Sequence, residues 1–293
     1  MIPKISIVLG TYNRLHFLKA AIESIRNNGI TIPYECIVID GGSTDGTHSW
    51  LCKQKDIISI IQYNHGKWKN KHINRHSWGY FMNKAFNATH GKYILMISDD
   101  CLLHPDAIMN GINFFEETLK INSKLGALAF FWRNWPEQQN YNVGFTFGKK
   151  IFVNHGLFLR SALLDVNWFD EVNFSFYHAD GDICLKLWEK GYEILASPNS
   201  FVEHFVHTNL KNRRINLITQ LQDWNYYSLK WKNKFEDFND QENGGWIINM
   251  PTKKINLINK HRFLQFLIYK NIILQKSKSL LKKWMIKNSL TNL

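Results

Sequence analysis

Two adjacent carboxylates, Asp99 and Asp100, end the apolar stretch YILMISDD at residues 93–100. Like charges a few ångströms apart repel, and each raises the pKa of the other unless a cation neutralises them. Carboxylate oxygens are also common ligands of Mg²⁺ and Mn²⁺. The pair therefore predicts a cation site. The alternative is a solvated turn, or the N-cap of the helix that follows.

The elements around this pair predict where other polar groups lie. Apolar segments with strand character alternate with helical patterns, which indicates a mostly parallel sheet covered by helices on both faces. Ligands bind outside the carboxyl ends of such strands, so the segments TYNR, DGGSTDG and SDD should meet at one edge of the sheet. The expected strands are 4–10, 35–40, 57–63, 92–98 and 125–131, and the expected helices include 76–91 and 105–121.

The net charge of +12 is spread unevenly over the 293 residues. Residues 251–293 hold ten Lys or Arg and no Asp or Glu, whereas the rest of the chain holds 26 basic and 24 acidic side chains. A nearly neutral body argues against nucleic acid as a partner. The composition changes near residues 245–252, so we expect a domain over 1–245 and a basic helical tail over 246–293.

The tail segment KSKSLLKKWMIK, residues 276–287, has the pattern of an interfacial helix. A helical projection places its large apolar residues on one arc and its lysines on the rest, which predicts peripheral contact with an anionic membrane. A solvated basic helix and a dimer contact are the alternatives. The preceding segment, RFLQFLIYKNIIL, is apolar on nearly all sides and is an alternative candidate for packing on the body. The arc consists of Leu280, Leu281, Trp284 and Met285, and the lysines are Lys276, Lys278, Lys282, Lys283 and Lys287.

The location is expected to be cytoplasmic, at the inner face of the membrane. The chain opens directly on a strand without a secretory signal pattern, and it has no apolar run of about 18 residues. Its four cysteines form no CxxC pair, which predicts reduced thiols and no structural zinc.

Six motifs together resemble family 2 glycosyltransferases. Each is weak alone, but their order and rough spacing over residues 4–208 are specific. The resemblance implies a GT-A, Rossmann-like fold with a mostly parallel central sheet, and an inverting transfer from a nucleotide-sugar donor with Mn²⁺ or Mg²⁺. The motifs are SIVLGTYNR, VIDGGSTDGT, GKYILMISDD, WFDE, ADGDICLKLWEKGY and SFVEH.

The resemblance implies a donor site at the strand ends. The SDD segment corresponds to the family's DXD motif, and alternation along a strand would turn Asp99 toward the ribose and Asp100 toward the metal. Asp40 is expected to contact the nucleoside, although Gly41 replaces the second acid of the commoner DDGS form; the alternative is a turn-forming aspartate. Thr11 and Tyr12 are expected to line the base pocket, with Arg14 and Arg75 near the phosphates; Tyr12 in the core and Arg75 in an exposed loop are the alternatives.

The resemblance also implies the groups that perform the transfer. Asp180 falls on the position of the general base, which takes the proton of the acceptor hydroxyl. Ala179 stands where an acid is frequent, and Asp182 is the second candidate, although the helix dipole also explains it. His204 matches a terminal histidine that binds metal or diphosphate, and an imidazole among carboxylates favours Mn²⁺ over Mg²⁺. A structural histidine is the alternative.

These assignments predict an inverting glycosyltransferase that acts in surface polysaccharide synthesis with a UDP-sugar as the expected donor. Its partner would be a glycan or a lipid-linked acceptor. The aromatic segment 131–147 is either an acceptor wall or hydrophobic packing. The competing functions are a nucleotide-sugar hydrolase and a non-enzymatic basic module for membrane or nucleic acid.

Overall fold

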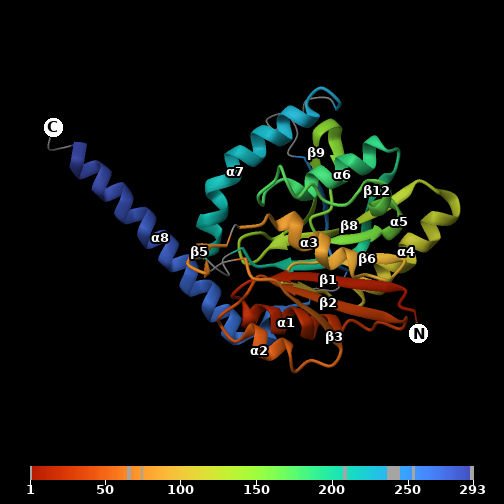
Figure 1. Cartoon of the computed structure of the whole chain (residues 1–293), viewed down its shortest axis with the longest axis horizontal. Coiled ribbons are helices and arrows are strands. Elements are labelled where there is room, and N and C mark those ends of the chain that lie inside the picture. Colours follow the sequence, from red (N-terminus) through yellow and green to blue (C-terminus); the bar gives the residue numbers. More distant parts are fainter. Residues whose placement is uncertain are drawn as a thin grey trace.

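The middle of the fold is a parallel β-sheet (Figure 1). Strand β1 (Ile5–Thr11) lies between β2 (Tyr34–Asp40) and β6 (Tyr93–Met96), and β3 (Ile57–Ile61) extends the sheet beyond β2. All four run in the same direction, so their carboxyl ends share one edge. The computed structural model describes residues 2–64, 67–73, 75–206, 210–235, 245–252 and 255–290.

The second half of the sheet mixes strand directions. Strand β11 (Gly156–Leu159) runs antiparallel between β6 and β8 (Leu125–Asn134). Strand β12 (Glu193–His204) is parallel to β8 and pairs on its other side with the short antiparallel β7 (Cys101–Leu103). The remaining strands are β9 (Tyr141–Thr146), β10 (Lys150–Ile151), β13 (Trp246–Asn249) and the hairpin β4 (Lys67–Trp68) with β5 (Lys71–His72).

Helices cover both faces of the sheet because its strands are apolar on both sides. On β1, Ile7 and Leu9 belong to the core beneath α1 and α4, whereas Val8 belongs to the core beneath α3 and α6. The expected mostly parallel α/β architecture is thereby confirmed. The helices are α1 (Leu15–Arg26), α2 (Thr47–Leu51), α3 (Trp78–Asn87), α4 (Ala107–Ile121), α5 (Arg160–Asp165), α6 (Ala179–Glu189), α7 (Leu210–Trp231) and α8 (Arg262–Leu290), with 3₁₀ turns η1 (Phe147–Lys149) and η2 (Leu257–Lys260).

The start of the C-terminal region packs on the body. Strand β13 pairs antiparallel with β9, so the sheet continues just past the expected boundary at residue 245. Leu264 and Ile268 of α8 are buried in a small core with Phe17 and Phe205. Packing of the segment upstream of the lysines is therefore confirmed. The division into a 1–245 domain and a 246–293 tail stays a prediction.

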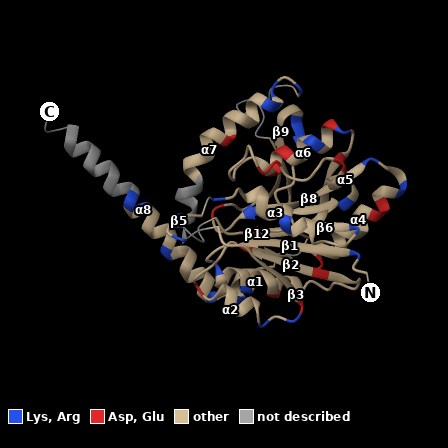
Figure 2. Cartoon of the chain, viewed as in Figure 1, with Lys and Arg blue, Asp and Glu red and all other residues tan. Residues whose placement is uncertain are grey.

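Figure 2 shows basic residues on α8 before the part of the helix whose side chains are not described. Lys276 and Lys278 are described, but the side chains of residues 279–290 lie outside the described part of the chain, and with them most of the interfacial pattern expected for 276–287. Over the ranges that are described, no helix combines the length and the apolarity needed to cross a bilayer.

Candidate active site

A first cavity, of about 160 Å³, lies at the carboxyl ends of β1 and β6. Five of the six residues expected to bind the donor line it: Thr11, Tyr12, Arg14, Arg75 and Asp99. Thr11 ends β1, and Asp99 follows the neighbouring β6, so the parallel pairing brings them together. The Thr11 hydroxyl donates to Asp99 Oδ2 at 2.7 Å. The topology thus gathers side chains that are 88 positions apart.

The two adjacent carboxylates lie in a turn and not on a strand. Strand β6 ends at Met96 and β7 begins at Cys101, so strand alternation, the basis of the expected orientations, is wrong for this pair. The N-cap alternative is also wrong, because Asp106 and neither of these two residues occupies the N-cap position of α4. Even so, the turn directs Asp99 and Asp100 into different cavities.

Arg14 supplies part of the positive charge that the pair requires. Its Nη1 lies 2.8 Å from Asp99 Oδ1 and 2.8 Å from Asp100 Oδ2. Burial acts to lower the pKa of Arg14, but the two carboxylates outweigh it and raise that pKa. Two carboxylates and one guanidinium leave one negative charge when all are ionised. The turn therefore still attracts a cation.

For both carboxyl groups, burial raises the pKa and the positive charge of Arg14 lowers it. Burial raises the pKa of Asp99 to about 6, although Arg14 opposes the shift. Burial also acts to raise the pKa of Asp100, but the charges of Arg14 and His204 outweigh burial, and the pKa of Asp100 is lowered. Asp100 is therefore the member of the pair that stays ionised over the wider pH range, as a metal ligand must.

A second cavity, of about 330 Å³, adjoins the first and shares Arg14, Trp78, Ser98 and other residues with it. Asp100, Asp180 and His204 all line this second cavity. These are the residues expected to bind the metal and to act as the base. The structure thus places them in one cleft, next to the cavity lined by the expected donor-binding residues.

His204 and Asp100 fit a divalent ion by their chemistry and orientation. His204 is the last residue of β12, and its Nδ1 lies 2.8 Å from Asn134 Oδ1, which can only accept. The hydrogen bond thus assigns the proton to Nδ1 and leaves Nε2 with a lone pair. Nε2 lies 3.6 Å from Asp100 Oδ1. Two ligands are thereby directed at one another across a short gap.

Asp180 lies at the start of α6, on the wall of the second cavity. Its Oδ2 accepts a hydrogen bond from Asn154 Nδ2 at 3.1 Å, and its Oδ1 accepts one from the Gly181 amide at 2.9 Å. Both bonds hold the carboxylate in one orientation. Its role as the base stays a prediction.

Asp182, the second candidate for the base, has a different position. It is fully buried, and its Oδ1 pairs with Lys230 Nζ at 2.8 Å and accepts from Trp231 Nε1 at 2.7 Å. Lys230 and Trp231 are consecutive residues of α7, so the contacts of Asp182 connect α6 to α7. It is not among the described residues that line the cavity.

Asp40 lies at the end of β2 but is not among the described residues that line the first cavity. Its carboxylate is buried and accepts from the Ser43 hydroxyl at 2.5 Å and from the Ser43 amide at 3.1 Å. Gly41, the residue that departs from the DDGS form, lines the first cavity in its place. These contacts are those of a turn-forming aspartate. A nucleoside contact by Asp40 stays a prediction.

Comparison with known proteins agrees with this geometry. The family model for glycosyl transferase family 2 matches residues 6–178, more than half of the chain. The chain belongs to this family. It is 24% identical over 249 residues to an uncharacterized glycosyltransferase of Methanocaldococcus jannaschii, covering 79% of this chain and 81% of the relative. The chain is therefore a glycosyltransferase, as its motifs predict.

Solved structures share the fold of this transferase. A mannosyltransferase of Pyrobaculum calidifontis in complex with GDP-Man and Mn²⁺ matches with a TM-score of 0.55 and 18% identity, over 77% of this chain and 64% of that one. S. aureus TarS matches with a TM-score of 0.54 and 15% identity, over 80% of this chain but only 44% of TarS. Its fragment 1–349 in complex with UDP matches with a TM-score of 0.55 and 14% identity, over 82% and 73%. These likenesses confirm the GT-A fold.

Aromatic side chains of the transferase line the cleft, but they differ from those that the sequence indicated. Trp78, Phe176 and Tyr177 line the second cavity, whereas no described residue of 131–147 lines either cavity. Trp135 packs on Phe205 and on Tyr269 of α8, as the packing alternative expects. The contacts of Trp135 are those of the packing alternative, and the position of an acceptor wall stays a prediction.

Asp223 positions this aromatic wall and was missed in the sequence. It is a buried residue of α7, and its carboxylate accepts hydrogen bonds from the amides of Ser175, Phe176 and Tyr177 at 2.9, 3.0 and 2.9 Å. Helix α7 thus fixes the loop that precedes the proposed base. The family motifs end before this helix, so they gave no signal for it.

His155 was missed for a similar reason. It lies buried on the wall of the second cavity, just before β11, in the segment VNHG that matches no motif. Gly156 is required beside it, because a Cβ there would overlap the Leu128 carbonyl oxygen of β8. Burial lowers the pKa of His155 to about 3, so the imidazole is neutral at neutral pH.

Proposed function

We propose that this transferase moves a sugar with inversion from a nucleoside diphosphate, with UDP as the expected nucleotide, to a hydroxyl of a glycan or lipid-linked acceptor. The observation that carries the proposal is the shared cleft. Asp100, Asp180 and His204 line a cavity that adjoins the one lined by Thr11, Tyr12 and Asp99. Nucleotide recognition and proton transfer thereby have adjacent sites.

The proposed donor site uses the first cavity. Tyr12 and the backbone at Thr11 would contact the base, and Asp99 would accept from the ribose. Arg14 lines both cavities and Arg75 lines the first, so the diphosphate would lie between these two cations. The similar structures were solved in complex with GDP-Man and with UDP, which supports a nucleotide as part of the donor.

The transfer itself takes place in the second cavity. The acceptor oxygen attacks the anomeric carbon, and the bond from that carbon to the diphosphate oxygen breaks with its electron pair going to the leaving group. Asp180 takes the proton of the acceptor hydroxyl. A divalent ion on Asp100 and His204 would act as a Lewis acid toward the leaving diphosphate. The Mn²⁺ in the mannosyltransferase complex supports such an ion.

A panel of nucleotide-sugars tests the proposed activity. Purified protein is incubated with UDP-, dTDP- and GDP-sugars, with and without Mn²⁺, and calorimetry measures donor binding while released nucleotide reports turnover. We expect metal-dependent binding of UDP-sugars, and turnover that rises when an acceptor hydroxyl is supplied. Metal-independent release at the same rate with and without acceptors would instead indicate the hydrolase.

We further propose that the lysines near the end of α8 attach the enzyme to anionic membrane in the cytoplasm, where a lipid-linked acceptor would lie. Lys276 and Lys278 follow the packed start of the helix, and Figure 1 shows α8 leaving the body after those contacts. Each lysine near an anionic surface contributes about 1 kcal/mol. The membrane role rests on this charge and on the sequence pattern.

Vesicle sedimentation tests the membrane contact. We expect the wild type to sediment with phosphatidylglycerol vesicles, and replacement of the five tail lysines by Gln to weaken binding by more than about tenfold. Neutral vesicles and 0.5 M salt should also abolish sedimentation, because salt screens surface charge. Equal sedimentation of wild type and the five-lysine variant would exclude a role for these lysines.

A further inference from the structure

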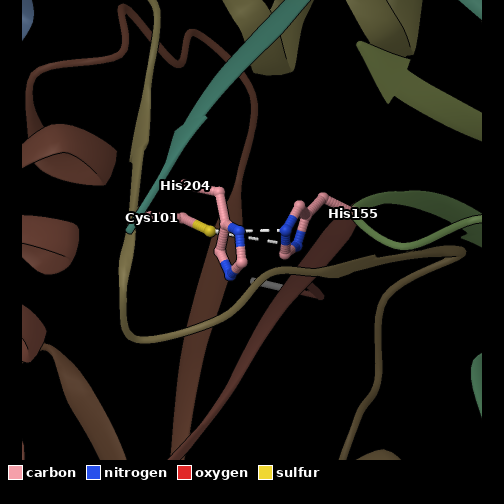
Figure 3. Close-up of side chains that lie close together, drawn as sticks. All are labelled: Cys101, His155 and His204. Atoms are coloured by element: carbon pink, nitrogen blue, oxygen red, sulfur yellow. Dashed lines mark hydrogen bonds between the residues drawn. The ribbon is translucent and has the colours of Figure 1, made fainter. Parts of the chain in front are cut away.

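Two buried side chains, Cys101 and His155, lie beside His204 (Figure 3). One potential ligand atom from each of Cys101, His155 and His204 lies within 4.8 Å of the others. Cys101 Sγ is 3.4 Å from His155 Nε2, and Asp100 Oδ1 is 3.6 Å from His204 Nε2. One thiol and two imidazoles thus lie close together, and the Asp100 carboxylate adjoins them through His204.

The sheet fixes three of these positions independently of any ligand. The register of β12 against β7 places His204 directly opposite Cys101. Strand β11, which begins at Gly156 beside Met96 of β6, places His155 near the turn that carries Asp100. Cys101 follows Asp100 in sequence, so the cluster has rigid strands on three sides. Such preorganisation is what a metal site requires.

Two of the separations, one in each of two residue pairs, match those of ligands on one ion, whereas the atoms of Cys101, His155 and His204 lie within 4.8 Å of one another. Nitrogen and oxygen ligands lie about 2.0–2.2 Å from Zn²⁺ and thiolate sulfur about 2.3 Å, which sets ligand atoms about 3.3–3.7 Å apart at tetrahedral angles. The two short separations in this cluster, 3.4 and 3.6 Å, fall in that range. The competing explanation of the 3.4 Å separation between Cys101 Sγ and His155 Nε2 is a hydrogen bond between thiol and imidazole in a packed core.

We propose that the divalent-ion site of this transferase includes Cys101 and His155 in addition to Asp100 and His204. The set is rich in nitrogen and sulfur, so it takes Zn²⁺ or Co²⁺ in preference to Mg²⁺. Binding releases the thiol proton to solvent and leaves a thiolate on the ion. The role of the ion in sugar transfer rests on the proposed function. The set of residues that bind the ion does not depend on that function.

Cobalt spectroscopy tests the composition of the site without any substrate. Co²⁺ bound to a thiolate gives a charge-transfer band in the near ultraviolet, which carboxylate and imidazole ligands do not give. The Cys52→Ser protein is used as the parent, because Cys52 is the exposed cysteine. We expect the band in this parent at one equivalent of Co²⁺, and its loss on addition of Zn²⁺.

Variants assign the ligands. Cys101→Ser should abolish the band, and His155→Gln should weaken Zn²⁺ binding by at least about tenfold in competition with a chelator. Cys36→Ala removes a buried cysteine of β2 outside the cluster and should retain both the band and the affinity. Circular dichroism confirms that each variant is folded.

The opposite results are equally clear. A parent that binds Co²⁺ without the band would exclude Cys101, and a His155→Gln variant with parental Zn²⁺ affinity would exclude His155. Because first-row metals follow a fixed order of affinity in most sites, tighter binding of Zn²⁺ than Mn²⁺ alone would not support the proposal. Transfer activity enters none of these measurements, so a failure of the proposed function would leave their outcome unchanged.

Discussion

The Asp180→Asn variant is expected to lose about 10²–10⁴-fold in the rate of sugar transfer, the usual contribution of a positioned general base. Its affinity for the nucleotide donor should stay within about twofold of the wild type, because Asp180 lines only the second cavity. The carboxamide has nearly the same shape as the carboxylate and still accepts from the Gly181 amide. What it cannot do is take the proton of the acceptor hydroxyl.

Single-turnover kinetics and calorimetry separate the two effects of this substitution. The first measures the transfer step and the second measures donor binding. Asp182→Asn is the matched control, because Asp182 lies two residues away but is bonded to Lys230 and Trp231. We expect this control to lower the thermal stability and to retain transfer in the folded protein. If Asp180→Asn transfers normally while folded Asp182→Asn does not, the base has been assigned to the wrong carboxylate.

The Asp100→Ala variant is expected to lose metal-dependent donor binding and about 100-fold or more in kcat/KM. A Lewis-acid ion at a leaving diphosphate contributes several kcal/mol, and each 1.36 kcal/mol is a factor of ten in rate. Arg14 remains paired with Asp99 in this variant, so no buried charge is left without its partner. The loss should therefore arise at the ion and not from unfolding.

Titration of UDP in the presence and absence of Mn²⁺ measures this effect. The wild type should bind UDP more tightly with the ion, and Asp100→Ala should show no difference between the two conditions. Asp56→Asn is a suitable control, since Asp56 is exposed and pairs with Arg26 away from both cavities. A retained metal dependence in Asp100→Ala would mean that the ion is held elsewhere.

The fold and one edge of the site were predictable because both follow from local patterns. Apolar strands that alternate with helices specify a parallel sheet, and a parallel sheet brings the ends of β1, β2 and β6 together. Thr11 and Asp99 meet for this reason. The ordered motifs then extended the site to Asp180 and His204, which no local pattern would have connected.

The remaining parts of the site depend on contacts between distant segments. His155 and Cys101 meet because β11 and β12 take particular neighbours and registers in the sheet, which a single sequence does not reveal. Asp223 acts from a helix whose sequence resembles no motif of the site. The sequence also predicts strand alternation at Asp99 and Asp100, which lie in a turn, because the apolar run before them extends one residue beyond β6.

The placement of the nucleotide across two adjoining cavities is best measured by a crystal structure with UDP and a divalent ion. We expect the nucleoside beside Thr11 and Tyr12, and the diphosphate on an ion bound by Asp100 and His204. Asp180 should then face the position of the sugar from the other side of the second cavity. A nucleotide bound outside this cleft, or an ion that touches neither Asp100 nor His204, would contradict the proposed function.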